Sequence, residues 1–441
     1  MNNNAYTAKN SRAAYHGRHI LAKDISTGTD TWETGINNNT LIFGPSGAGK
    51  TRHYVKPNIL NAYESIIVSD TKGSLYSEVG PQLEKRGYVV KNINFTDLTA
   101  GSGYNPMDYI RYDEEADKYS EQDMKSLISC LVEDLHSNDA YWDHAARQYL
   151  GVLMSYTLEA LPKEEHTLAT VARLLAIMDT PDFEEMIHEL EILKPHNITS
   201  ERYNAIRKNQ RAEKMHQSII GVLSTHLDPL CFDEAVALYE KPDRIDFSQL
   251  TKQKTAIFLT ISDMDRSVDK LANAFMTQAL QQLCRIADQD YPEHRLPIPV
   301  RLYLDDFATN LQIPEFDKII SVIRSREIYV SVILQSITQL DSLYGFNRAR
   351  TILNNCDQML YLGGQDIDTA RLISEKTNKS LYSILSMPLD EAYLFIRGQE
   401  PIRTQKYEVQ DEPSTQEVSP LYRETAGIAE GRKPDLQSAA G

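Results

Sequence analysis

One eight-residue run constrains the fold of this chain more than any other feature of its sequence. It reads Gly44, Pro45, Ser46, Gly47, Ala48, Gly49, Lys50 and Thr51. The run fits the pattern G-x-x-x-x-G-K-[ST], in which backbone N–H groups and the start of a helix cradle phosphate. An apolar run at 40–43 precedes it as a short buried strand, and 53–60 can continue as a helix. This strand–loop–helix context predicts an α/β domain that binds a nucleoside triphosphate.

Two residues of the run have direct chemical roles. The ammonium of Lys50 is expected to reach the β- and γ-phosphates, and the hydroxyl of Thr51 to ligate the Mg²⁺ that bridges them. The whole run, 44–51, is therefore the candidate nucleotide-binding loop, and Mg²⁺ is expected with the nucleotide.

A second set of polar residues ends an apolar strand far downstream. Asp305 and Asp306 directly follow the apolar run 302–304. Open α/β sheets bind ligands at the carboxyl ends of their strands. Asp305 is therefore predicted to organise Mg²⁺ and its waters, and Asp306 to orient and deprotonate an attacking water. A strand end followed by an acidic turn is the alternative interpretation.

Two further polar residues flank the apolar run 329–334. Gln335 could hold the γ-phosphate or the attacking water, although a loop glutamine with satisfied hydrogen bonds fits equally well. Arg324 could reach the nucleotide of a neighbouring subunit and stabilise charge on the transferred phosphoryl group. A surface salt bridge of Arg324 with Asp317 or Glu327 is the alternative.

The residue pattern divides the chain into four parts. Residues 1–37 are polar and turn-rich, and we expect a leading segment outside the core. Alternating strands and helices over 38–110 and 246–407 predict one P-loop domain with a mainly parallel sheet. Between them, helical spacing over 111–245 predicts an all-α insertion. Residues 408–441 are poor in large apolar residues, which is typical of a disordered tail.

Individual elements follow from the same patterns. The predicted strands are 40–43, 65–69, 88–90, 255–260, 300–304, 329–334, 359–362 and 392–396. The predicted helices include 167–177, 181–193, 201–226 and 271–287.

The net charge of −16 makes the surface as a whole repel nucleic acid. Any DNA contact must therefore be local. On the predicted helix 201–226, Arg207, Arg211 and Lys214 are spaced to share one face. Such a face could hold single-stranded DNA, with Tyr203 as a surface on which a base can stack. A solvated helix face balanced by Glu201 and Glu213 is the alternative.

Cysteine usage and hydropathy bear on location. The four cysteines form no C-x-x-C pair, which favours reduced thiols in a cytoplasmic protein. No stretch reaches the length of apolar sequence that a membrane span requires. We therefore expect no transmembrane segment in this chain.

Beyond single motifs, the sequence resembles the type IV secretion coupling proteins, the TraG-like conjugative DNA transfer ATPases of the FtsK–HerA motor group. The resemblance covers roughly residues 20–405. The segments that carry it are 22–26, 35–39, 54–58, 69–75, 104–107, 304–307, 313–314, 334–336, 339–340, 344–345 and 362–364.

This resemblance implies a RecA-like, ATP-hydrolysing motor domain that assembles as a homo-hexamer. The implied substrate is DNA, in particular single-stranded DNA, with a relaxase or effector protein. The implied location is the inner face of the cell membrane, against the channel components. By position, Arg324 resembles the family's trans-acting arginine finger and Gln335 its γ-phosphate sensor. A nucleotide-regulated docking platform with little motor activity is the alternative function.

Two departures from the family pattern stand out. The usual Asp-Glu pair is Asp305-Asp306 here, so the expected base is one methylene shorter. Family members usually begin with transmembrane helices, whereas we expect none in this chain.

Overall fold

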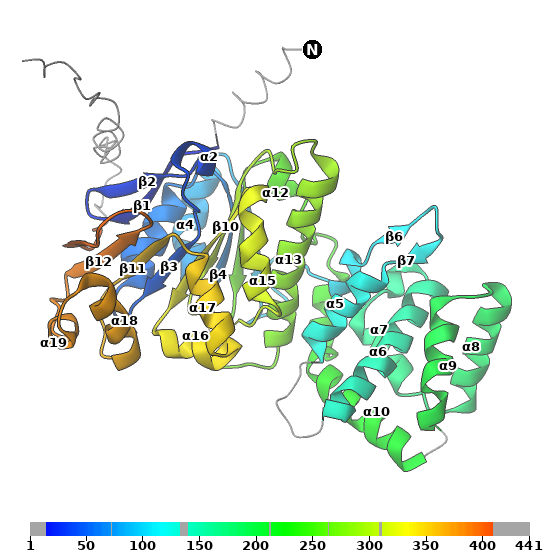
Figure 1. Ribbon diagram of the computed structural model, residues 1–441. Coiled ribbons are helices and arrows are strands. Elements are labelled where there is room, and N and C mark those ends of the chain that lie inside the picture. The colour runs from blue at the N-terminus through cyan, green and yellow to red at the C-terminus, as the bar shows by residue number, and fades with distance from the viewer. Residues whose placement is uncertain are drawn as a thin grey trace, which may run out of the picture.

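The computed structural model describes residues 15–408 apart from 72, 133–139, 211–212, 263 and 308–310. Its centre is a nine-stranded sheet, counted over these residues (Figure 1). The strands are β3 (Thr40–Phe43), β4 (Ser65–Asp70), β5 (Val89–Asn94), β8 (Thr255–Thr260), β9 (Val300–Leu304), β10 (Ile328–Leu334), β11 (Gln358–Tyr361), β12 (Glu391–Ile396) and β13 (Ile402–Gln405).

The order of strands across the sheet is β13, β12, β11, β3, β10, β9, β4, β8 and β5. All neighbours from β11 to β5 are parallel, whereas β12 and β13 are antiparallel at one edge. The prediction of an α/β fold with a mainly parallel sheet is confirmed. Each predicted strand exists, and β13 is one that the apolar pattern missed.

Helices cover both faces of the sheet, and the side chains of β3 pack against both helical layers. Its side chains alternate, so Leu41 and Phe43 join one apolar cluster and Ile42 joins the other. The first cluster contains residues of α13 (Asp269–Asp290), α15 (Phe316–Val322), α16 (Ile337–Tyr344), α17 (Phe346–Asn354) and α18 (Ile367–Thr377). The second contains residues of α3 (Lys56–Leu60) and α4 (Ser74–Lys85). The fully apolar strands are therefore buried on both sides.

The N-terminal segment differs from the prediction. Residues 18–28 form a hairpin of β1 (Arg18–Ala22) and β2 (Ile25–Gly28), followed by α2 (Thr31–Thr34). Leu21 and Ala22 are buried in the second cluster, so this part belongs to the core. The hairpin lies beside the C-terminal strands in Figure 1, and the amide of Lys23 donates to the carbonyl of Gln405 at 3.1 Å.

Residues 111–245 form a separate group of helices beside α13 (Figure 1). They are α5 (Glu121–Leu131), α6 (Ala140–Ala160), α7 (Leu168–Leu175), α8 (Pro181–Leu193), α9 (Ile198–Gln210), α10 (Glu213–Leu227) and α11 (Asp233–Glu240). We call residues 111–245 the helical region and the rest of the described chain the sheet region. The helical region also contains a small hairpin, β6 (Tyr112–Asp113) and β7 (Lys118–Tyr119), so it is not purely α-helical.

The predicted helix 201–226 is wrong in one respect. It is two helices, α9 and α10, which both pack against α6. Separate burial of each helix on α6 outweighs the continuous helical spacing of the sequence, which by itself favours one long helix.

The remaining elements are short. They are η1 (Thr51–Val55), η2 (Pro106–Tyr109), η3 (Lys163–Glu165), η4 (Asp228–Leu230), α12 (Gln249–Lys252), η5 (Ile323–Arg326) and α19 (Leu381–Leu385). No helix among the described residues combines the length and the apolar character that crossing a membrane requires. Residues 409–441, most of the predicted tail, lie outside the described residues.

Candidate nucleotide-binding site

The P-loop runs from the end of β3 into a helical turn, as predicted. Gly47 and Gly49 have φ values of +81° and +82°, which residues with a Cβ rarely adopt. The loop closes on itself, because the amide of Ala48 donates to the carbonyl of Pro45 at 3.1 Å. The helix begins as the π-helical turn η1 before α3 continues it. Such turns are frequent at functional sites.

Lys50 lies inside this loop. It is buried, and its ammonium donates to the carbonyl oxygens of Gly44 at 2.9 Å and Pro45 at 3.4 Å. It also lies 3.5 Å from Oδ1 of Asp306. The cation is therefore shared between the loop and the acidic pair that follows β9.

Thr51 and Asp305 meet although they are far apart in sequence. The hydroxyl of Thr51 donates to Oδ2 of Asp305 at 2.8 Å. The pKa of Asp305 is raised to about 6, first by burial and also by the neighbouring charge of Asp306, while Thr51 and Lys50 act in the opposite direction. A bound cation close to Asp305 would stabilise the charged form of this buried carboxylate, so the site is suited to receive one.

Asp306 is positioned by its backbone. Its φ of +48° lies in the left-handed region, which Asp tolerates because its short side chain can hydrogen-bond locally. Its amide donates to Oδ1 of Asp305 at 3.1 Å, and its side chain faces Lys50. This conformation is a physical reason for Asp at a position where the family usually has Glu.

Gln335 lies at the same edge of the sheet. Leu334 pairs with Phe43 in the parallel register of β10 and β3, so Gln335 follows β10 beside the start of the P-loop. The amide of Gly44 donates to the carbonyl of Leu334 at 3.1 Å, and the amide of Gln335 donates to Oε1 of Gln339 at 3.0 Å.

Arg324 lies just before the start of β10, at the opposite end of the strands from the P-loop. It belongs to η5, which precedes β10, whereas the P-loop follows β3, a parallel neighbour of β10. Its guanidinium donates to the carbonyl of Gly35 at 3.4 Å. Within the described part of the chain it forms no ion pair with Asp317 or Glu327. The structure therefore does not bring Arg324 to the P-loop of its own subunit.

Several residues near the P-loop belong to no sequence motif and were not predicted as part of the site. Tyr54, in η1, shares hydrogen bonds with Nε2 of His19 at 2.7 Å and with Ser331 of β10 at 2.9 Å. Burial lowers the pKa of His19 well below its usual value, and the charge of Arg301 lowers it further. Arg301 is itself buried and forms a 3.0 Å ion pair with Glu64. This network connects the P-loop helix to the N-terminal hairpin and to β10, the strand that Gln335 follows.

The proposed DNA-binding residues are not gathered as predicted. Arg207 lies on α9 and forms an exposed 2.9 Å ion pair with Glu184. Lys214 is exposed on α10, a different helix. Arg211 lies outside the described residues. Tyr203, a candidate stacking residue, is only 7% exposed and packs against Phe183. The two residues of the three that the structure describes, Arg207 and Lys214, therefore lie on different helices and do not share one helix face.

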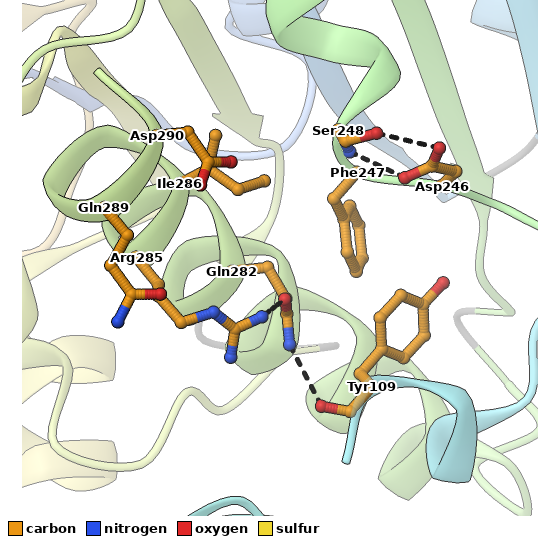
Figure 2. A pocket seen from close by; sticks show the side chains of 9 residues that line it. All are labelled: Tyr109, Asp246, Phe247, Ser248, Gln282, Arg285, Ile286, Gln289 and Asp290. Atoms are coloured by element: carbon orange, nitrogen blue, oxygen red, sulfur yellow. Dashed lines mark hydrogen bonds between the residues drawn. The ribbon is translucent and has the colours of Figure 1, made fainter. Parts of the chain in front are cut away.

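A cavity of about 240 Å³ lies elsewhere, between α13 and the chain before α12 (Figure 2). Its lining residues are Tyr109, Asp246, Phe247, Ser248, Gln282, Arg285, Ile286, Gln289 and Asp290. Its polar groups largely bond one another, as Arg285 does with Gln282 and Ser248 with Asp246. It contains none of the predicted site residues.

The residues present at the P-loop fit a magnesium nucleotide. Thr51 and Asp305 offer hard oxygen ligands side by side, which suits Mg²⁺ held jointly by protein and phosphate oxygens. Among the described residues no group of three or more His, Cys, Asp or Glu could hold a metal ion by itself. Phosphate oxygens and waters would therefore have to complete the coordination.

Comparison with known proteins agrees with this geometry. Residues 4–380 match the family model described as type IV secretory system conjugative DNA transfer. The chain belongs to this family. Two proteins named conjugal transfer protein TraG, both from Escherichia coli, are 22% identical to it over 356 and 354 residues. These alignments cover 78% and 77% of this chain, which spans about half (55%) of the length of each relative.

Solved structures show the same fold. The conjugative coupling protein TrwBdeltaN70, in a form with sulfate, has a TM-score of 0.66 at 17% identity, covering 91% of this chain and 92% of that one. TrwB has also been solved with the ATP analogue ADPNP and with ADP and Mg²⁺, at a TM-score of 0.64 each. VirB4 of Thermoanaerobacter pseudethanolicus has a TM-score of 0.54 at 16% identity, covering 90% of this chain and 98% of that one.

Proposed function

We propose that this chain is an ATP-hydrolysing coupling protein that drives a DNA or nucleoprotein substrate to a type IV secretion channel. The observation that carries the proposal is the convergence of Lys50, Thr51, Asp305 and Asp306 at one sheet edge. TrwB complexes with ADPNP and with ADP and Mg²⁺ support the choice of ATP and Mg²⁺.

Each residue of the cluster has a proposed role. The loop amides of 44–51 and the Lys50 ammonium bind the phosphates, replacing the contacts of Lys50 with the Gly44 and Pro45 carbonyls. Thr51 and Asp305 hold Mg²⁺, which neutralises the phosphate charge when bound. Asp306 orients the attacking water and accepts its proton, and Gln335 contacts the γ-phosphate or that water.

Arg324 is proposed to act on the nucleotide of a neighbouring subunit. Its distance from the P-loop of its own chain supports action across a boundary, and the family resemblance supports a homo-hexamer. The proposed partners are single-stranded DNA, a relaxase or effector, and channel components at the inner face of the cell membrane. Arg207, Arg211 and Lys214 remain the candidate DNA contacts.

A nucleotide-regulated docking platform is the second candidate function. Two observations favour it: Asp306 faces Lys50 rather than standing free, and the helical region is strongly acidic. In such a protein nucleotide binding would stabilise assembly while hydrolysis stayed slow.

Hydrolysis measurements separate the two functions. The purified chain should hydrolyse ATP with Mg²⁺, faster with single-stranded DNA, and Lys50→Ala should lower the rate at least about 100-fold because it removes the phosphate cation. Light scattering should report the assembled mass in the same samples. Nucleotide binding without DNA-stimulated hydrolysis would favour the docking platform. Hydrolysis by Lys50→Ala close to wild type would remove the P-loop assignment.

A further inference from the structure

Two residues near the end of the described part of the chain contact the P-loop and the helical turn after it. We call Lys406 and Tyr407, which directly follow β13, the C-terminal strap. Lys406 is 7% exposed, and its ammonium donates to the carbonyl oxygen of Ala48 at 3.1 Å. The carbonyl oxygen of Tyr407 can only accept, so Nδ1 of His53 donates to it, at 2.6 Å. The strap thus contacts both the loop and the helical turn that follows it.

The sheet edge holds the strap in place. The amide of Lys406 donates to the carbonyl of Asp390 at 2.9 Å, and β13 pairs with β12 up to Gln405. The amide of Lys23 in the N-terminal hairpin donates to the carbonyl of Gln405 at 3.1 Å. These backbone contacts hold Lys406 in place, so the fold determines where its ammonium lies.

The contact with Ala48 orients the peptide that joins Ala48 to Gly49. A trans peptide carries its C=O and N–H on opposite sides. An ammonium that holds the Ala48 carbonyl turns the Gly49 N–H away from the strap. In a P-loop, amides of this kind are the donors that cradle phosphate.

His53 constrains the same peptide from a second direction. A Cβ on Gly49 would lie only 2.2 Å from Cδ2 of His53, so the imidazole occupies the space that Gly49 leaves open. The hydrogen bond to Tyr407 fixes the rotation of this ring. Gly49 is thereby held between the ring and the loop.

Packing alone does not explain a lysine here. A buried ammonium is costly unless its donors are used, and burial lowers the pKa of Lys406. Among the residues that the structure describes, its side chain has one hydrogen-bond acceptor, the Ala48 carbonyl. An apolar side chain of similar length would fill the space without this cost.

We propose that Lys406 is a positioning residue for phosphate binding, which orients the Gly49 amide toward the nucleotide through the Ala48 carbonyl. The proposal rests on the proposed nucleotide-binding function and adds a contribution from the C-terminal end of the motor. It connects nucleotide binding to the segment that leads into the tail.

The test compares four variants with the wild-type full chain: Lys406→Met, Lys406→Arg, Lys50→Ala and Lys23→Met. Lys23 is the matched control, because its ammonium also contacts this strand, at Oε1 of Gln405, but not the P-loop. Affinity is measured with fluorescently labelled ADP and Mg²⁺, thermal unfolding without nucleotide, and hydrolysis over a range of ATP concentrations.

Lys406→Met should weaken labelled ADP binding at least about tenfold, the size of one lost hydrogen bond to a charged group. At saturating ATP its kcat should stay within about threefold of wild type, because Lys406 does not touch the reacting atoms. Lys406→Arg should restore binding, and Lys23→Met should bind like wild type. The unfolding temperature of Lys406→Met should not lie below that of Lys23→Met.

Two results would overturn the proposal, and they are distinguishable. If wild type binds the probe and Lys50→Ala does not, while Lys406→Met binds normally or loses affinity only as it loses thermal stability, the positioning role is wrong. If neither wild type nor Lys50→Ala binds the probe, the nucleotide-binding function itself fails and the positioning role fails with it.

Discussion

The sheet region and the helical region use charge in opposite ways. The sheet region buries ion pairs and polar networks, such as Arg301 with Glu64 and Thr51 with Asp305. The helical region has 26 acidic and 14 basic residues, a net charge of −12 out of −16 for the chain. Some of its ion pairs, such as Arg207 with Glu184, are exposed on both sides.

This contrast determines how each region responds to substitution. Breaking a buried pair leaves an uncompensated charge and costs about 3–5 kcal/mol, whereas an exposed pair contributes about 0–1 kcal/mol. The sheet region therefore depends on single contacts. The helical region acts through its summed field, which repels DNA and attracts basic partners.

The largest expected effect is the loss of hydrolysis on substitution of Arg324, and it tests whether the sheet region acts on the nucleotide of a neighbouring subunit. Arg324→Ala should lower stimulated hydrolysis by about 10³-fold without weakening nucleotide binding, because an arginine finger stabilises transferred charge. Steady-state hydrolysis and labelled ADP titration measure the two quantities. Arg326→Ala is the control, since Arg326 is bound to Asp288 within the chain.

Mixing subunits makes the Arg324 prediction decisive. Rings of Arg324→Ala and Lys50→Ala subunits should recover part of the hydrolysis, because an intact P-loop can meet an intact arginine at mixed interfaces. Mixed rings that form, as shown by differently tagged subunits, but stay inactive would assign Arg324 a role within its own chain.

The acidic pair is the next test of dependence on single contacts. Asp306→Asn keeps the left-handed backbone but loses the base, so kcat should fall about 100-fold with labelled ADP affinity unchanged. Asp306→Glu, which restores the family's usual residue, should keep or raise kcat. Normal turnover by Asp306→Asn would show that another residue accepts the proton.

The burial of His19 predicts that the free energy of unfolding depends on pH, an effect smaller than those expected for Arg324 and Asp306. Its folded pKa lies below the unfolded value of about 6.5, so its contribution is fully present above pH 6.5. As pH falls toward the folded pKa, the unfolded chain binds the proton first and about 1.4 kcal/mol is lost per pH unit. Denaturant unfolding of His19→Gln between pH 7 and 5 should lack this slope. His144 is exposed in the helical region, so the control His144→Gln should retain this slope. Equal slopes for the two variants would contradict the prediction.

The smallest effect belongs to the helical region. Replacing Arg207 and Arg211 with Glu should weaken single-stranded DNA binding and reduce its log–log salt slope by about 0.7 per lost phosphate contact. Basal hydrolysis should not change. The control is Arg173→Glu, which reverses another exposed, paired arginine. Equal affinity and slope for both variants would remove Arg207 and Arg211 from the DNA path and favour protein docking.

Local sequence was sufficient for much of the sheet region. The apolar runs predicted β3, β4, β8 and β9 at or within one residue of their ends, because strands buried on both faces need continuous apolar residues. The residues that follow them, Lys50 and Asp305, meet because parallel strands end at one edge. Helix boundaries in the helical region were harder, since α9 and α10 depend on packing against α6.

What the sequence by itself determined is the nucleotide loop, the acidic pair and the alternation of strands and helices, since each depends on neighbouring residues. Only the tertiary structure decided that Arg324 lies away from its own P-loop, that Leu21 enters the core, and that Lys406 reaches Ala48. These contacts depend on which strands lie side by side. Strand order is set by packing across the whole sheet, and no local pattern of residues records it.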